Sequence, residues 1–431
     1  MKRTILLVIG LLLVVCLGSV ALYQVPAVQD RLAWRLDNLR SNIKYLLNPP
    51  EEVVFIPEGQ AEITPTPVTP SVTPTVTATL PGPTPTDAPS ATPTATTTPL
   101  PETALLSDVK YEDQHGRLNY CGPANLSMAM TFWGWQGNRD MVGRAIKPAT
   151  ADKNVMPYEM QEFIAANSEL TSVIRMGGDI DVVRRLVAGG FPVLLEKGTF
   201  LTDIAGEYSW MGHYQLATGY DDERQVMIVQ DSYVGENHEM SYDGIMEGWR
   251  AFNFVFLVAY PPEREAEVMA LLGPYQDDRY GAEVAAERAS DEIFSLEHPR
   301  DRYFAWFNRG TSLMELQDYA GASAAYDEAF SSIYPTIPAG ERPWRMMWYQ
   351  TGPYKAYYYA GRYWDVISLA TTTLEDFISE PVLEESFYWR ALAKEALGDI
   401  PGAIADLREA VKLNPNFTAG QQQLDRLQGG G

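Results

Sequence analysis

The only cysteine outside the N-terminal apolar run stands where the sequence predicts the start of a helix. Cys121 is followed by Gly122 and Pro123 and then by apolar residues at helical spacing, which are Ala124, Leu126, Met128, Ala129, Met130 and Phe132. Proline suits a first helical turn, where the N–H groups have no helical partner. These N–H groups and the positive end of the helix dipole favour thiolate over thiol. We therefore expect Cys121 to be a candidate nucleophile.

A glutamine upstream adds a hydrogen-bond donor to this candidate site. Gln114 lies seven residues before Cys121, and its amide can donate a hydrogen bond near the same sulfur. A thiol at a helix start with an amide donor beside it is half of a cysteine-nucleophile site, because the donor stabilises negative charge that develops during the reaction. The alternative is that Cys121 is a small buried apolar residue without a catalytic role.

The sequence also predicts a β-hairpin that brings a histidine next to an aspartate. One strand-like run begins at His213, and a second ends at Asp231. Folding the hairpin about Asp222 and Glu223 places Tyr214 opposite Asp231, so that His213 and Asp231 emerge as neighbours at its open end. A carboxylate beside an imidazole selects one tautomer and stabilises the imidazolium. The alternative is a structural histidine at a strand end, capped by a nearby aspartate.

In their order along the chain, these pieces resemble papain-like peptidases. The resemblance is closest to the cysteine peptidase family thirty-nine-like group, relatives of the double-glycine leader peptidases, and it covers about residues 108–260. The matching pieces are Gln114, Cys121-Gly122-Pro123-Ala124, Gly212-His213-Tyr214, Thr218-Gly219-Tyr220 and Val229-Gln230-Asp231-Ser232. The pieces that carry Cys121, His213 and Asp231, taken in this order, are more specific than the Cys-Gly-Pro piece alone.

The resemblance implies a role for each candidate residue. Cys121 is the expected nucleophile and His213 its base, Asp231 orients the imidazole, and Gln114 forms the oxyanion hole together with the backbone N–H of Cys121. The implied fold is α+β, with a helix that bears the cysteine packed on an antiparallel sheet that bears the histidine. Double-glycine specificity is not carried over, because the sequence shows no transporter domain and the Gln-to-Cys spacing is one residue longer than the papain pattern.

The C-terminal part of the chain repeats itself. Small and aromatic residues recur in three similar blocks, which begin near Ala305-Trp306, Tyr349-Gln350 and Tyr388-Trp389. These blocks resemble tetratricopeptide repeats, helical hairpins of about 34 residues that bury their apolar faces by stacking. We expect an all-α solenoid over residues 301–427, preceded by a helical connector over 263–300. The repeats are expected to recruit a protein partner or substrate.

Two N-terminal segments suggest attachment to a membrane. Residues 5–23 are apolar and uncharged, which predicts a signal-anchor or transmembrane helix within 1–23. A cleaved signal peptide, which would make the protein secreted, is the alternative. Residues 24–55 predict an amphipathic juxtamembrane helix, with apolar positions at Leu32, Leu36, Leu39, Ile43 and Leu46. This helix is expected to lie on the lipid surface, to pair with another copy, or simply to extend the anchor.

A Pro/Thr-rich segment separates this helix from the predicted peptidase domain. Residues 56–107 contain repeated Thr-Pro and no Lys or Arg. Such a composition cannot bury an apolar core and favours an extended chain. We expect a stalk that holds the peptidase domain, residues 108–262, away from the membrane.

Charge and cysteine usage narrow the possible functions. A formal net charge of −23 argues against a nucleic-acid partner, because no basic field is available to displace counterions. The sequence has two cysteines and no Cys/His cluster, so we expect no disulfide within a domain, no structural zinc and no cofactor.

Taken together, the sequence predicts a membrane-anchored, extracytoplasmic cysteine peptidase at a bacterial cell surface, with repeats that recruit a protein. One alternative is a non-catalytic adaptor with a papain-like binding domain, and another is an amidase that acts on cell-wall peptide. The presence of Cys, His, Asp and Gln together argues against the adaptor. The acidic surface argues against an anionic wall polymer as substrate.

Overall fold

The computed structural model describes residues 18, 26–59, 99–117, 119–149, 152–202, 206 and 208–429. The predicted membrane span at residues 5–23 and the central part of the Pro/Thr segment, 60–98, lie outside the described residues. Within the described ranges, no helix is both long enough and apolar enough to cross a bilayer.

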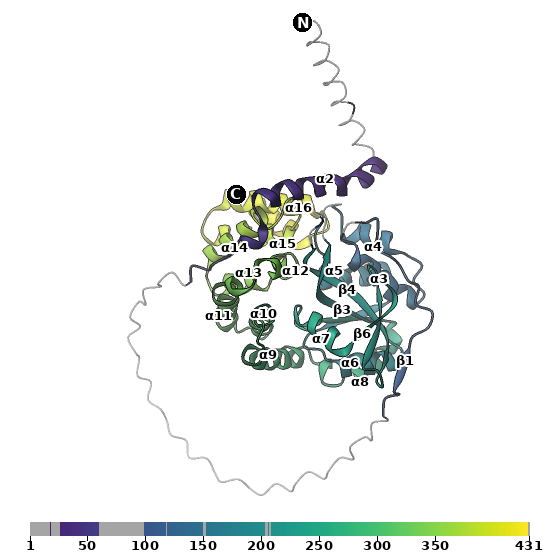
Figure 1. The fold of residues 1–431 in the computed structure, drawn as a ribbon. Helices are drawn as coiled ribbons and strands as arrows, with labels where there is room; N and C mark the ends of the chain where they lie inside the picture. Colours follow the sequence, from purple (N-terminus) through teal and green to yellow (C-terminus); the bar gives the residue numbers. More distant parts are fainter. Residues whose placement is uncertain are drawn as a thin grey trace, which may run out of the picture.

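An antiparallel sheet forms the centre of the first half of the structure (Figure 1). In the described residues it has seven strands, ordered β2-β7-β3-β4-β5-β6, with β1 paired to β4. The strands are β1 (Thr103–Leu105), β2 (Thr171–Arg175), β3 (Val193–Thr202), β4 (Tyr208–Asp221), β5 (Val226–Asp231), β6 (Gly235–Ser241) and β7 (Phe256–Tyr260). The long strands β3 and β4 pair along ten residues and form the middle of the sheet.

Helices cover both faces of this sheet. They are α3 (Cys121–Phe132), α4 (Arg139–Ile146), α5 (Pro157–Asn167), α6 (Ile180–Ala188), α7 (Tyr242–Arg250) and α8 (Glu265–Leu272). Leu194 and Leu216 belong to the apolar core that includes α3, α4 and α5. Their neighbours Val193 and Ala217 belong to the core that includes α6 and α7, because successive side chains of a strand point to opposite faces.

This architecture confirms the predicted α+β class, since the cysteine-bearing helix packs on an antiparallel sheet that carries His213. The sequence pattern predicted both strands of the β4–β5 hairpin. It missed β6, which reads Gly-Glu-Asn-His-Glu-Met-Ser and pairs with β5 alone. An edge strand needs no apolar face of its own, so it lacks the alternation that identifies a strand.

The pairing of the β4–β5 hairpin differs from the prediction by one position. Asp221 pairs with Val226, so the turn has four residues, and a bulge at Thr218 then shifts the register. Leu216 consequently pairs with Gln230, which places Gln215 across from Asp231. The predicted partner, Tyr214, is therefore wrong. The turn lies one residue later than predicted, which moves the pairing by two positions, and the bulge then moves it back by one.

The C-terminal half is helical. Its helices are α9 (Asp278–Ser295), α10 (Pro299–Glu315), α11 (Tyr319–Asp327), α12 (Met346–Tyr349), α13 (Gly352–Tyr359), α14 (Tyr363–Glu375), α15 (Glu384–Ala396), α16 (Ile400–Leu413) and α17 (Thr418–Gly429), with a π-helix at Glu328–Ile333. Small residues lie where helices meet. A side chain on Gly310 would come within 2.7 Å of the Tyr326 ring, so α10 and α11 approach closely only with glycine there.

The sheet and the repeats share one apolar core. This core contains two aromatic residues from the sheet domain, Trp210 of β4 and Phe252 after α7, and two from the repeats, Phe304 of α10 and Tyr349 of α12. The ring centroids of Trp210 and Phe304 are 5.6 Å apart. Arg345 is buried at the same boundary, where its guanidinium donates to Ser209 Oγ at 2.7 Å and to the Trp210 carbonyl at 2.9 Å. The repeats therefore support the strand that carries His213.

Replacing Arg345 with alanine is expected to lower the free energy of unfolding by about 3 kcal/mol, because Ser209 and Trp210 would both lose a hydrogen bond to a charged donor. Denaturant unfolding followed by circular dichroism measures this change. Arg408→Ala, at an exposed position of α16, is the matched control and should have almost no effect. Equal stability of the two variants would contradict the bridging role of Arg345.

The predicted juxtamembrane helix is docked on the repeats. α2 (Pro26–Leu47) lies across the C-terminal helices (Figure 1). Arg40 donates to Glu380 at 3.1 Å, and Ser41 Oγ lies 2.8 Å from Ser379 Oγ. The Lys44 ammonium donates to backbone carbonyls at the end of α14, which have no helical partner of their own. The basic face of α2 therefore binds the same chain. Extension of an anchor helix stays a prediction, because residues 1–17 and 19–25 lie outside the described residues.

Both described ends of the predicted stalk, residues 56–107, are also fixed to the folded body. On the N-terminal side, the Phe55 ring lies 5.3 Å from Phe330, and the Glu58 amide donates to Asp365 at 2.7 Å. On the C-terminal side, β1 pairs with β4, and the Tyr220 hydroxyl donates to the Pro101 carbonyl at 2.8 Å. The Pro/Thr segment thus joins two docked points of the folded body. The stalk itself stays a prediction, because residues 60–98 lie outside the described residues.

Candidate active site

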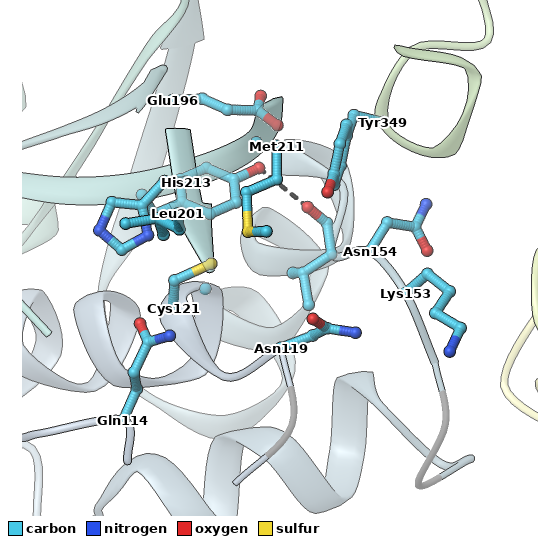
Figure 2. A pocket seen from close by; sticks show the side chains of 14 residues that line it. Gln114, Asn119, Cys121, Lys153, Asn154, Glu196, Leu201, Met211, His213 and Tyr349 are labelled. Carbon is cyan, nitrogen blue, oxygen red and sulfur yellow. Dashed lines mark hydrogen bonds between the residues drawn. The ribbon is translucent and has the colours of Figure 1, made fainter. Parts of the chain in front are cut away.

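The thiol of Cys121 lies at the first residue of α3, as the sequence predicts. The first backbone hydrogen bond of the helix runs from the Ala124 amide to the Tyr120 carbonyl, so the amides of Cys121 and Gly122 have no partner within the helix. Cys121 is partly exposed and lines a cavity of about 40 Å³ (Figure 2). A side chain on Gly122 would come within 3.0 Å of Val155 and Met160, which explains why glycine follows the cysteine.

The structure brings His213 and Asp231 together beside this thiol. Nε2 of His213 lies 2.9 Å from Oδ1 of Asp231, and both side chains are almost completely buried. The imidazole lies beside the Cys121 thiol in the same cavity, and Nδ1 is the ring nitrogen that Asp231 leaves free to interact with it. Cys121, His213 and Asp231 therefore follow one another from helix α3 through strand β4 to the end of strand β5.

The charges of this series stabilise one another. Burial alone would raise the pKa of the Cys121 thiol, but the hydrogen bond and positive charge of His213 outweigh burial and lower that pKa. Burial opposes the imidazolium, yet the Asp231 carboxylate and Cys121 raise the pKa of His213 to about 9. Burial disfavours the charged form of Asp231. The positive charge of His213 and several hydrogen bonds nevertheless hold the pKa of Asp231 well below its usual range. Both shifts favour the thiolate–imidazolium form of the pair over the thiol–imidazole form.

Asp231 is held in place by donors that the sequence analysis did not identify. The backbone amides of Tyr233 and Val234 donate to Oδ1 at 2.8 and 3.0 Å, and the Gln215 side-chain amide donates to Oδ2. Gln215 lies two residues after His213 on the same strand, so both side chains point to the same face of the sheet. That spacing is the signal by which Gln215 could have been found from the sequence.

Gln114 is oriented toward the thiol by Ser232. The Ser232 hydroxyl donates to Oε1 of Gln114 at 2.7 Å, and the Gln114 backbone amide donates to the Ser232 carbonyl at 2.8 Å. Because Oε1 accepts this bond, the Nε2 group of Gln114 is available to the cavity, where Figure 2 places the amide next to Cys121. Gln114 therefore occupies the position expected of an oxyanion donor.

A buried asparagine ties these elements together. Nδ2 of Asn125, one turn after the cysteine, donates to the carbonyls of Cys121 and Tyr214 at 2.9 Å and to Ser232 Oγ at 3.1 Å. It thereby joins the helix that carries the thiol to the strand that carries the imidazole. The sequence analysis missed Asn125, because its partners lie 89 and 107 residues away.

The far side of the cavity contains a buried acid. Glu196 of β3 is 4% exposed and lines the cavity together with Tyr214, whose hydroxyl donates to the Val155 carbonyl at 2.8 Å. Burial raises the pKa of Glu196 well above its usual value, because a buried carboxylate loses its hydration.

The repeats contribute one wall of the same cavity. Tyr349 of α12 lines it opposite Cys121, and its ring lies so close to Gly212 that a side chain there would come within 3.1 Å (Figure 2). The sequence identified Tyr349 only as the start of the middle repeat, and no local pattern indicates that it reaches the candidate active site.

The other three histidines lie away from this cavity. His115 is exposed and pairs with Asp113 at 2.8 Å, His238 lies on the edge strand β6, and His298 caps α10 and lies 3.1 Å from Glu341. Among the histidines of the described residues, His213 is the one that lines the cavity.

A thiol at a helix start, with an imidazole and a carboxylate on an adjoining antiparallel sheet, defines a papain-like arrangement. Residues 106–256 match the model of the Peptidase_C39 like family, and residues 384–417 match the model of the tetratricopeptide repeat. The chain therefore contains a peptidase C39-like domain followed by a tetratricopeptide repeat, which confirms the resemblance inferred from the sequence.

One solved structure to which the chain is similar is described as a C39-like peptidase from Bacillus anthracis. The two chains are 14% identical, the match covers 37% of this chain and 98% of the other, and the TM-score is 0.31. The curated proteins contain no match to this chain.

Proposed function

We propose that the protein is a cysteine peptidase that hydrolyses peptide bonds through Cys121, His213, Asp231 and Gln114. The observation that carries this proposal is that His213 lines the cavity beside Cys121 while its Nε2 lies 2.9 Å from the Asp231 carboxylate. A non-catalytic binding domain would not require a buried carboxylate that stabilises an imidazolium next to a partly exposed thiol. The family match supports a peptidase-type domain over residues 106–256.

In the proposed reaction, the Cys121 thiolate attacks the carbonyl carbon of the peptide bond. The resulting oxyanion accepts hydrogen bonds from Nε2 of Gln114 and the backbone N–H of Cys121. The His213 imidazolium donates its proton to the leaving nitrogen as the C–N bond breaks, which leaves a thioester on Cys121. The neutral imidazole then takes a proton from water as that water attacks the thioester, and the acid product and the thiolate are released.

The pH dependence tests this proposal. A peptidyl fluoromethyl ketone should alkylate Cys121 at pH 6 at least about tenfold faster than it alkylates a free thiol, whose pKa of about 8.5 leaves little thiolate there. Peptide hydrolysis should decline as the pH rises through about 9, because His213 then loses the proton that the leaving nitrogen needs. Mass spectrometry locates the label, and initial rates give the profile. A free-thiol pH profile for the alkylation, together with no hydrolysis, would indicate a binding domain.

We further propose that the repeats recruit a protein partner or substrate, since tetratricopeptide repeats commonly mediate protein–protein contacts. The apolar, uncharged run at residues 5–23 supports a membrane-anchored, extracytoplasmic location. Under this proposal the acidic body faces the exterior, and the substrate is a peptide or protein.

A further inference from the structure

One face of α2 exposes a stripe of large apolar side chains to solvent. Leu39 is 56% exposed, Ile43 54% and Leu46 83%. The residues of this α2 stripe follow one another at steps of three or four, with one adjacent position, and are Leu36, Leu39, Ile43, Leu46 and Leu47. Burial of a large aliphatic side chain is favourable, so a continuous exposed stripe marks a surface that another apolar phase covers.

The opposite face of α2 is already occupied by the repeats. Ser41 is 1% exposed, Lys44 donates to carbonyls at the end of α14, and the Tyr45 ring lies 5.6 Å from Trp344. The polar and basic face of α2 thus binds the repeats, and its apolar face points away from them. This is the reverse of an ordinary surface helix, whose apolar face is turned inward and whose polar face is turned to water.

The charge distribution indicates what covers the α2 stripe. α2 holds four Lys or Arg and two Asp, whereas the 384 residues that follow it hold 27 Lys or Arg and 54 Asp or Glu. A negatively charged surface therefore attracts α2 and repels the rest of the chain. A second copy of this strongly acidic chain would have to overcome the repulsion between the two bodies.

The chain that precedes α2 points to the same occupant. The uncharged apolar run at residues 5–23 ends three residues before Pro26, where the helix begins. A segment of that length and composition partitions into lipid, which brings the start of α2 to a bilayer surface. An amphipathic helix at that place lies in the plane of the interface with its apolar side chains in the boundary between headgroups and acyl chains.

We propose that the α2 stripe is buried in the interface of an anionic lipid bilayer, while the other face of α2 holds the repeats. Because the repeats share a core with the sheet, the peptidase body is then held directly against the membrane. The Pro/Thr segment cannot move it away, since both flanks of that segment are docked. This inference does not depend on whether the candidate active site is catalytic.

The test measures contact between the α2 stripe and lipid in the full chain. Cys16→Ser and Cys121→Ala remove the natural thiols, and Leu46→Cys then carries a polarity-sensitive fluorophore. The chain is reconstituted into vesicles of phosphatidylglycerol and phosphatidylcholine, with the phosphatidylcholine brominated near the headgroup end of its acyl chains. The matched control carries the fluorophore at Phe294→Cys, because Phe294 is 88% exposed on the distant helix α9.

At position 46 we expect a blue-shifted emission, loss of most of that emission to brominated lipid, and protection from iodide in the water. At position 294 we expect emission typical of water, no quenching by brominated lipid, and strong quenching by iodide. Iodide quenching at position 46 equal to that at position 294 would overturn the proposal. Protection from iodide without quenching by brominated lipid would also overturn it, and would assign the α2 stripe to a second copy of the chain.

Discussion

Replacing Cys121 with alanine is expected to reduce peptide turnover by about a million-fold, the loss seen when the nucleophile of a hydrolase triad is removed. The thiolate is the only group in the cavity that is placed to form the thioester, so His213 and Gln114 cannot replace it. The fold should be retained, because alanine is a good helix former and Cys121 is partly exposed at the start of α3. Initial rates on a fluorogenic peptide, together with circular dichroism, measure both expectations.

The chain provides a matched control for this experiment. Cys16 is the other cysteine of the sequence and lies in the apolar run, so Cys16→Ala should keep the wild-type rate. Substantial hydrolysis by Cys121→Ala would show that another group performs the reaction. Equal loss in the two variants would show that the activity depends on the thiol content and not on this site.

Replacing Asp231 with asparagine is expected to lower the rate of hydrolysis by about 10²- to 10⁴-fold, the range that a positioned acid–base group contributes. His213, Tyr233, Val234 and Gln215 all donate hydrogen bonds to the Asp231 carboxylate. An asparagine has one acceptor oxygen, so its NH₂ group must face one of these donors. The imidazole would lose both its orientation and the charge that raises its pKa.

The pH profile separates this cause from simple unfolding. Because the Asp231 charge raises the pKa of His213 to about 9, its removal should move the alkaline decline of activity to lower pH. Asp113→Asn is the matched control, since Asp113 pairs with an exposed histidine, His115, at 2.8 Å. Full activity of Asp231→Asn with an unchanged profile would make Asp231 a strand-end residue without a role in catalysis.

Much of the fold was predictable because its signals are local. The Gly122-Pro123 pair and the apolar spacing after it predict the start of α3 at Cys121, and the structure has the helix at Cys121–Phe132. Two β-branched runs around an acidic turn predict the hairpin of β4 and β5. The recurring small and aromatic residues predict the helical repeats. In each case neighbouring residues encode the element through its own period.

The exact pairing within the site was not predictable in the same way. A one-residue change in register moves every side chain to the other face of a strand, and the bulge at Thr218 leaves no mark in the apolar pattern. The sequence therefore placed His213 near Asp231 but paired Asp231 with Tyr214 instead of Gln215. It also missed β6, whose polar residues read as a loop.

The sequence by itself determined that this protein has a peptidase C39-like domain, that helical repeats follow it, and that one thiol, one imidazole, one carboxylate and one amide are the candidates for its chemistry. Tertiary structure decided what surrounds them. Tyr349 reaches the cavity, Arg345 supports β4, and α2 binds the repeats through contacts between residues more than 130 positions apart. No periodic pattern encodes such contacts, because they depend on how completed elements pack, and packing is a property of the whole chain.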